Sequence, residues 1–370
     1  MGWGMRLVWR VVGVLAFALL WFWWATAALA SDQPMTFRYM APEDRLHALA
    51  LGTAWTIYAD GVIGTNTPKQ AEQLIEQLHI PPWSVVYLNS PGGNLFSGME
   101  LGRVFRKHEF YTDVGVHSGP KSYDNSPGIC MSACTLAYLG GKFRYLVKGS
   151  TYGVHRFFLS GADNDSVGSA DALAVGQIFS AAIMDYIREM GADPALLNEM
   201  TKAGETEINI LSSARLEQLG VVNNGTGKTV WTIESLGNPT PVMYLKGERD
   251  TQFGLNKFMI YCDGVKKVLH VVFDPQGRAG EVTTMHAISL MLDNDTIKIG
   301  DHVVAGPVDS NGWINTLFEL NKQLIDRLLA AKSVGVVFQY SYEAPFFLGF
   351  QGMDFTDGRA KLEGLLSRCK

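Results

Sequence analysis

Runs of basic residues are absent from this chain, and acidic residues outnumber basic ones. Its 31 lysines and arginines stand against 36 aspartates and glutamates, which gives a net charge of −5. Proteins that bind nucleic acid need clustered cations that displace the counterions of phosphates, so this composition argues against a nucleic-acid partner. Hydrophobic residues make up 47% of the chain, which is typical of a globular protein and excludes a disordered one.

Cysteine is scarce, and the motifs that commonly hold metals or nucleotides are missing. The four cysteines form no paired CxxC motif and no spacing with histidine that suits zinc. The triplet Gly227-Lys228-Thr229 lacks the upstream glycine spacing of a Walker motif. We therefore predict no metal and no cofactor, and we expect any activity to be independent of ATP.

Long hydrophobic runs are also missing, except at the N-terminus. Residues 1–30 place Arg6 and Arg10 before an apolar run that ends in Ala28-Leu29-Ala30, which is the order of a secretory signal peptide. The stretch 11–30 is also long enough to span a bilayer, so a retained membrane anchor is the alternative. Both interpretations predict export of the remaining chain, either to the periplasm or as a secreted protein.

An even number of cysteines in an oxidising compartment favours disulfides. We predict a bridge between Cys262 and Cys369, where closing a loop of about 100 residues contributes on the order of 4–5 kcal/mol. Cys130 and Cys134 would lie about 6 Å apart on a helix, so a strained and reducible bridge around Ser132 is one interpretation. Two small buried side chains that pack well are the other.

The length of 370 residues allows two domains, which we expect at 31–235 and 242–370 with a short linker between them. In the first domain, predicted strands alternate with predicted helices, and this rhythm indicates an α/β layer fold with right-handed crossovers. The predicted strands are 53–59, 84–88, 111–116, 144–147, 152–155 and 208–211, and the predicted helices are 67–79, 95–107, 170–190 and 213–219.

The second domain is predicted to be a smaller α+β domain without a chemical motif. Two apolar runs around Asp263-Gly264 predict a hairpin. Asn311 is positioned to cap a helix from about Trp313 to Ala331, which carries apolar residues at helical spacing. A strand at 333–340 and a helix at 358–368 complete the prediction.

Two segments of the first domain offer backbone amides to a ligand. Ser90-Pro91-Gly92-Gly93 follows a buried strand, and its glycines allow close approach of the backbone to a ligand. Residues 128–134 open a predicted helix with Ser132 in its first turn, where unpaired amides stabilise a developing oxyanion. An ordinary N-cap serine is the alternative at this position.

A third segment supplies a candidate base. His155 ends a short predicted strand and can take a proton from a serine hydroxyl, although a structural histidine is the alternative. His117, at the start of the polar loop 117–127, is a weaker candidate base. The loop itself is either a gate over the site or a solvated surface loop.

Taken in order, three motifs resemble the Clp-protease/crotonase superfamily, specifically the Clp protease proteolytic subunit and its periplasmic relatives. They are LNSPGGN at 88–94, GxxxS at 128–132 and GVH at 153–155, and LSSARLEQLGVV at 211–222 resembles the closing helix and strand of that family. The resemblance covers about residues 50–225 and none of the C-terminal domain. It implies a Clp-protease/crotonase-like layered sheet with crossover helices.

The resemblance also implies a serine hydrolase mechanism. Ser132 falls at the nucleophile position and His155 at the general-base position, and the amides of Gly92, Gly93 and Ala133 match the oxyanion hole. The substrate would be a short or unfolded peptide that binds as an added strand, and a homo-oligomer is expected. A membrane is a partner only if the N-terminal segment is retained.

One member of the family's constellation is missing. Ile208 occupies the position of the orienting aspartate, and its neighbours Glu207 and Asn209 face the other way on a regular strand. A bulge would bring one of them inward as a third member. Loss of the orienting acid costs about 10⁴ in rate in serine proteases. A catalytically weak or inactive peptide-binding or scaffold protein is therefore the main alternative.

Two further alternatives have less support. A Ser–Lys dyad would need a lysine near Ser132, and the neighbouring lysines, Lys121, Lys142 and Lys148, occupy no motif position. Crotonase-type acyl-CoA chemistry conflicts with the predicted export, since CoA is cytoplasmic.

Overall fold

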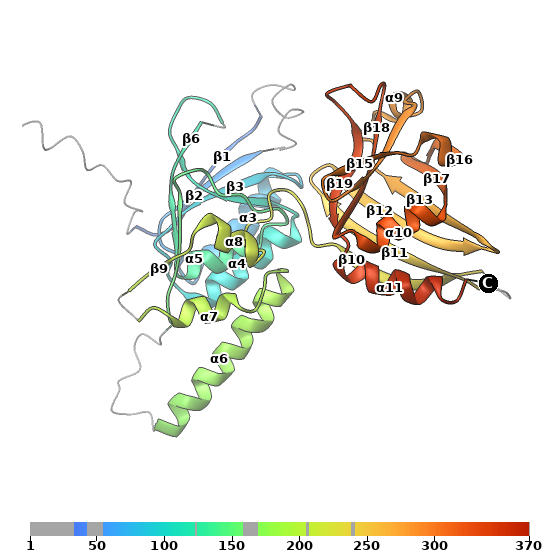
Figure 1. Ribbon diagram of the computed structural model, residues 1–370. Helices are drawn as coiled ribbons and strands as arrows, with labels where there is room; N and C mark the ends of the chain where they lie inside the picture. The colour runs from blue at the N-terminus through green and yellow to red at the C-terminus, as the bar shows by residue number, and fades with distance from the viewer. Residues whose placement is uncertain are drawn as a thin grey trace, which may run out of the picture. The chain divides into compact units, whose positions relative to one another are not determined.

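The computed structural model describes residues 33–42, 55–122, 124–157, 169–204, 207–237 and 241–369. The predicted signal segment 1–30 lies outside the described residues. The chain separates into two compact units, 1–222 and 223–370, which are coloured blue to green and yellow to red in Figure 1. Strand β10 (Val230–Leu236) pairs along its whole length with β11 (Val242–Thr251), so residues 223–235 belong to the second unit rather than to the first.

The first unit is built on a four-stranded sheet with the order β1-β2-β3-β4. Strand β1 (Thr36–Met40), which the sequence analysis did not predict, runs antiparallel to β2 (Thr56–Asp60). Strands β2, β3 (Val85–Asn89) and β4 (Tyr111–Val114) are parallel. Their side chains are almost all buried, as expected for strands covered on both faces.

The predicted helices that connect these strands are confirmed. Helix α3 (Thr67–Leu78) has a proline in its first turn and ends at His79 in a left-handed conformation. Helix α4 (Leu95–Lys107) starts where the Asn94 side chain accepts the Ser97 amide at 2.9 Å. Both are crossovers between neighbouring parallel strands, in agreement with the predicted α/β rhythm.

A small second sheet, ordered β7-β8-β9, carries the segments singled out in the sequence. Its strands are β7 (Ile129–Met131), β8 (Thr151–Val154) and β9 (Asn209–Ile210). A bridge between Ser90 and Cys130 joins the end of β3 to β7. Cys130 is therefore on a strand, whereas Cys134 lies in helix α5 (Ala133–Leu139), which begins only after Ser132. The predicted helical placement is wrong for Cys130.

The remaining elements of the first unit lie around these sheets. They are β5 (Val116–His117), β6 (Asn125–Ser126), α6 (Ser169–Glu189), α7 (Leu196–Thr201) and α8 (Ser213–Gln218). The strand predicted at 144–147 is wrong: this stretch makes a single bridge, between Thr112 and Arg144. Its backbone is held instead by hydrogen bonds from the Tyr145 amide to the Thr112 carbonyl at 2.9 Å and from the Val147 amide to the Asp113 carboxylate at 2.8 Å.

Two arginines hold the ends of α5 and α6 together. Arg144 is 3% exposed and donates to the carbonyls of Leu139, Gly141, Met190, Gly220 and Val221 at 2.7–3.2 Å. Arg106 donates to the first three of these carbonyls and to that of Gly140. Burial and the neighbouring Arg106 lower the pKa of Arg144 to about 10. The negative ends of the helix dipoles compensate this buried charge.

The second unit consists of two antiparallel sheets. One has the order β10-β11-β12-β13-β17-β16 and the other β15-β14-β18-β19. Further bounds are β12 (Gly254–Asp263), β13 (Lys266–Phe273), β14 (Ala287–Leu292), β15 (Asp295–Lys298), β16 (Val303–Ser310), β17 (Trp313–Leu320), β18 (Ser333–Gln339) and β19 (Leu348–Asp354). The helices are α9 (Ala279–Val282), η1 (Gly300–His302), α10 (Lys322–Ala330) and α11 (Thr356–Leu366). The predicted hairpin at Asp263-Gly264 is confirmed by the pairing of β12 with β13.

The helix predicted from Trp313 to Ala331 is wrong in its first half. Residues 313–320 form β17, whose side chains alternate between half-buried and buried, and Asn311-Gly312 is the turn that joins β16 to β17. Both turn residues have positive φ, 54° and 82°, as a type I′ hairpin turn requires. The helix cap is Asn321, whose side chain accepts the Leu324 amide at 2.9 Å.

Both cysteine pairs are joined as disulfides. Cys130–Cys134 spans Ser132 in the first unit, with the Cα atoms 5.2 Å apart. Cys262–Cys369 links β12 to the residues after α11 in the second unit, with the Cα atoms 5.8 Å apart. Within the described residues, no helix is long and apolar enough to span a bilayer, and no acidic, cysteine and histidine side chains gather into a metal site.

Candidate active site

Ser132 occupies a strained turn between strand β7 and helix α5. Its φ of 54° and ψ of −124° lie in a region that costs a non-glycine residue about 1–3 kcal/mol, and such strain is typical of functional turns. The turn is fixed on both sides. The Ser132 amide donates to the Gly153 carbonyl on β8 at 3.0 Å, and the Ser132 carbonyl accepts the Thr135 amide at 3.0 Å.

The Ser132 hydroxyl does not serve as a helix cap. Ser132 is the N-cap residue of α5, yet its side chain makes no capping hydrogen bond. The alternative interpretation of an ordinary N-cap serine therefore does not describe this residue. A half-buried serine on a sharp strand-to-helix turn has the geometry that exposes a nucleophile in hydrolases.

The glycine pair lies directly against this turn. Gly92 has a φ of +112°, and a Cβ added there would lie 2.7 Å from the Ser132 Cβ and 3.2 Å from the Ala133 amide nitrogen. Gly93 has a φ of +136°, and a Cβ there would collide with the Ile63 carbonyl. Glycine is thus required at both positions, because Gly92 lies against the Ser132 turn and Gly93 lies against the Ile63 backbone.

The three amides predicted for an oxyanion hole are not equivalent. The Gly92 amide donates to the Ser90 hydroxyl at 3.1 Å, so it is engaged within its own turn. The amides of Gly93 and Ala133 donate no hydrogen bond within the part of the chain that the structure describes. Ala133 is the first residue of α5, where amides have no partner inside the helix. Two of the three donors are therefore available.

His155 follows β8 directly and lines the same cavity as Ser132. The cavity measures about 20 Å³ and is otherwise walled by apolar side chains and one hydroxyl, those of Leu95, Thr135, Leu136, Val154, Phe157, Ile183 and Met200. His155 is half-buried, and its Nδ1 atom is buried. A cavity of this size holds about one water molecule.

The candidates for a third member lie on and beside β9. Asn209 donates its side-chain amide to the Glu199 carbonyl at 3.0 Å and to the Glu199 carboxylate at 3.3 Å. Glu199 also binds Arg215 at 2.7 Å. Glu207 is exposed, and Ile208 contacts Gly153, the glycine that precedes Val154 on β8. Position 208 thus lies beside β8, as the predicted register requires, but carries no carboxylate.

The alternative bases lie elsewhere. Among the described residues, no lysine lines the cavity of Ser132. Lys142 pairs with Glu109 at 3.1 Å. The His117 Nδ1 atom accepts a hydrogen bond from the Arg38 guanidinium at 3.0 Å, and its ring packs against Tyr58. The structure therefore brings His155, and none of these side chains, to the cavity of Ser132.

Two tyrosines that position α5 were not predicted from the sequence. The Tyr152 hydroxyl donates to the Thr135 carbonyl at 3.1 Å, and the Tyr186 hydroxyl donates to the Leu136 carbonyl at 2.7 Å. Both rings are fully buried, and burial raises the pKa of each hydroxyl. They remain neutral donors and fix the helix that follows Ser132. A tyrosine within an apolar strand or helix indicates a buried hydroxyl that needs an acceptor. The sequence does not reveal which carbonyl that acceptor is.

Comparisons with known proteins give structural neighbours alone. A scan against family models and a search of curated proteins found no match. The solved structures that are similar include two mutants of the 1510-N membrane-bound stomatin-specific protease, one with a substrate peptide. Their sequence identities are 20% and 21%, and their TM-scores are 0.34 and 0.33. ClpP1 from Listeria monocytogenes has 15% identity and a TM-score of 0.33.

These alignments cover 45% of this chain and 75%, 71% and 88% of the respective neighbours. All three neighbours bear the names of proteases of the Clp type or of the stomatin-specific type.

Proposed function

We propose that the first unit is an exported serine hydrolase that cleaves short or unfolded peptides without ATP. One observation carries the proposal: the Ser132 hydroxyl, released from helix capping on a strained turn, lines the same small cavity as His155. A serine nucleophile needs a base within reach and amides for the oxyanion. Ser132 and His155 line one cavity, and Gly92 lies against the Ser132 turn, which supports the proposal.

The chemistry follows an acyl-enzyme route. The Ser132 Oγ attacks the substrate carbonyl while His155 takes the hydroxyl proton. The amides of Gly93 and Ala133 stabilise the oxyanion, joined by Gly92 when its amide leaves the Ser90 hydroxyl. His155 returns the proton to the leaving amine, and water then hydrolyses the ester. Short or unfolded substrates fit this proposal because the sequence carries no Walker motif of its own.

A peptide-binding protein without catalysis is the second candidate. The cavity of about 20 Å³ between Ser132 and His155 excludes a peptide unless its walls move, and the Gly92 amide is engaged. Both observations favour a resting or inactive arrangement. Under this candidate, the same fold binds an extended peptide and does not cleave it.

A fluorophosphonate probe, which labels activated serines covalently, distinguishes the two candidates. We expect labelling of the full-length protein and of Ser213→Ala, an exposed serine at the start of α8. We expect no labelling of Ser132→Ala and strongly reduced labelling of His155→Gln. If the wild-type protein stays unlabelled in both oxidising and reducing buffer while circular dichroism shows it folded, the hydrolase proposal fails.

A further inference from the structure

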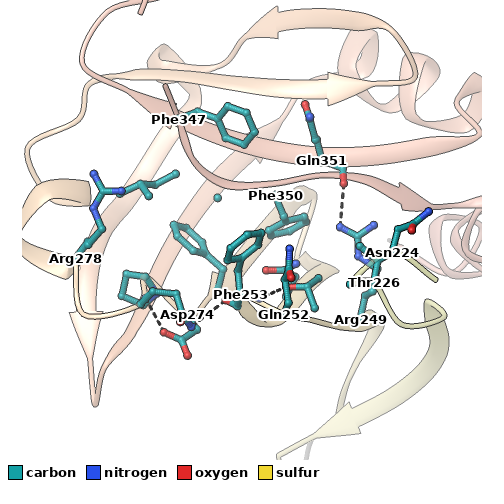
Figure 2. Close-up of a pocket in the computed structure, with 18 residues that line it drawn as sticks. Asn224, Thr226, Arg249, Gln252, Phe253, Asp274, Arg278, Phe347, Phe350 and Gln351 are labelled. Atoms are coloured by element: carbon teal, nitrogen blue, oxygen red, sulfur yellow. Dashed lines mark hydrogen bonds between the residues drawn. The ribbon is translucent and has the colours of Figure 1, made fainter. Parts of the chain in front are cut away.

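The second unit contains a cavity of about 440 Å³ that no step of the proposed hydrolysis uses. It is formed by residues 224–226, the turn between β11 and β12, residues 273–278, and the start of β19 with the residue before it. Figure 2 shows phenylalanines in the middle of this cavity, with Arg249 on one side and Arg278 and Asp274 on the other. The volume lies within the range of pockets that bind small molecules.

Four phenylalanines contribute to the walls. Phe273 and Phe350 are buried, at 2% and 4% exposure, whereas Phe253 and Phe347 are 66% and 40% exposed. Phe253 lies in the tight turn between β11 and β12, where the turn geometry does not require a large apolar residue. Phe346, the neighbour of Phe347, is 84% exposed. Clustered exposed aromatic residues beside a cavity are a mark of ligand binding.

Arg249 gives the cavity a buried positive charge. It is 8% exposed, and its guanidinium donates to the carbonyls of Gly352 at 2.8 Å and Gln351 at 2.9 Å. No acidic side chain lies within ion-pair distance of it in the described chain. Burial lowers its pKa, because a charge in an apolar environment without a counterion is unfavourable.

The other charges of the lining have partners nearby. Arg278 is paired with Glu281 at 2.6 Å. The Asp274 carboxylate accepts the Gln276 amide at 2.8 Å. Arg249 is therefore the lining cation whose positive charge is not balanced by a carboxylate, and it lines the same cavity as the phenylalanines. An apolar group and an anion together are the ligand chemistry that matches this lining.

We propose that this cavity binds an apolar molecule that carries a carboxylate. The apolar group, aromatic or acyl, lies among Phe253, Phe347 and Phe350, and the carboxylate lies at Arg249. The same chemistry has two sources, a free carboxylic acid and the C-terminal carboxylate of a peptide that ends in an apolar residue. The carboxylate of either ligand supplies a counterion to Arg249.

Isothermal titration calorimetry with the full chain tests the proposal. The probes are 4-phenylbutyrate, its amide 4-phenylbutyramide, a pentapeptide that ends in phenylalanine with a free carboxylate, and the C-terminal amide of that peptide. We expect saturable binding of at least one carboxylate, and binding at least about tenfold weaker for the matching amide. The acid that binds identifies the source of the ligand.

Two variants connect the binding to this cavity. Phe253→Ser removes an exposed turn residue and is expected to weaken binding at least about threefold. Its control is Val265→Ser, in the turn between β12 and β13, where Val265 is 78% exposed; we expect unchanged affinity. Arg249→Lys keeps the charge but not the fork of donors, and is expected to weaken the carboxylate more than the amide.

Three outcomes would overturn the proposal. They are the absence of saturable binding of both acids up to about 1 mM, equal affinity for an acid and its amide, and a Phe253→Ser protein that binds as the wild type does. Because Arg249 also binds two carbonyls of β19, Arg249→Lys is compared only after circular dichroism shows that it is folded. If Arg249→Lys is not folded, the Phe253→Ser variant alone decides the test.

Discussion

Replacement of Gly92 by alanine is the sharpest test of the contact between the glycine pair and Ser132. Gly92 has a φ of +112°, and a Cβ there would lie 2.7 Å from the Ser132 Cβ and 2.8 Å from the Met131 carbonyl oxygen. The left-handed conformation costs an L-residue roughly 1–2 kcal/mol, and the overpacking costs roughly 1–3 kcal/mol more. We therefore expect Gly92→Ala to lose about 2–5 kcal/mol of unfolding free energy.

The matched control separates the two costs. Gly191 also has a positive φ, +74°, but a Cβ there meets no atom within 4 Å. Gly191→Ala should therefore lose only the conformational part, about 1–2 kcal/mol, and should leave the reactivity of Ser132 unchanged.

Urea unfolding and the rate of fluorophosphonate labelling measure both effects. A displacement of the nucleophile by about 1 Å lowers the rate about 100-fold, so we expect Gly92→Ala to label about 100 times more slowly than Gly191→Ala. If Gly92→Ala were as stable and as reactive as the control, the glycine pair would not bear on the nucleophile turn and the reasoning would be refuted.

Three further predictions concern the first unit. Reduction of Cys130–Cys134, which spans Ser132, should change the rate of fluorophosphonate labelling, and Cys130→Ser should show the changed rate without reductant; an unchanged rate in both contradicts a redox link. Arg144→Met should lose about 3–5 kcal/mol of unfolding free energy in urea, because it leaves the carbonyls of Gly220 and Val221 without their donor; a loss below about 1 kcal/mol contradicts the bracing role. Burial raises the pKa of Asp113 from 3.8 to about 6, so the folded state binds the proton more tightly, and its stability should fall by about 3 kcal/mol as the pH rises from below about 4 to above about 6. Asp113→Asn retains an oxygen for the Val114 and Val147 amides and should lack this fall in pH-dependent urea unfolding, whereas an identical pH profile excludes Asp113 as the cause.

Local signals in the sequence were sufficient to predict an element whose structure depends on neighbouring residues of the chain. Helix α4 has the predicted bounds because Asn94 caps it, an interaction within four residues of chain. Buried parallel strands such as β3 were also predicted from local sequence, because a strand covered on both faces is a short continuous apolar run.

The prediction failed where one pattern fitted two periods. Leu317, Leu320 and Leu324 have helical spacing, but Ile314, Thr316, Phe318 and Leu320 also alternate at the period of a strand, and the latter set is the one that is buried. The positive φ values of Asn311 and Gly312 indicate which interpretation holds. Asn-Gly between two apolar runs is a hairpin signal, and it outweighs a possible cap.

The residues of the candidate site were predictable from the sequence, but the hydrogen bonds between them were not. The sequence singled out Ser132, His155 and the glycine pair, and the structure brings the first two to one cavity and the third against the nucleophile turn. The sequence does not indicate that the Gly92 amide donates to the Ser90 hydroxyl, because that hydrogen bond depends on the rotamer of the Ser90 side chain. The cavity of the second unit was missed altogether, since its lining comes from segments up to about 125 residues apart.

The bracing of α5 has a consequence for how a substrate would enter. This seven-residue helix is held at its start by the Ser132 turn and at its end by the guanidinium groups of Arg144 and Arg106. Because both ends of α5 are fixed, we expect Ser132 to keep its position while the cavity widens. Because the Tyr186 hydroxyl and the two arginines also tie α6 to α5, we expect the wall formed by Met200 of α7 and Phe157 to move when a peptide enters.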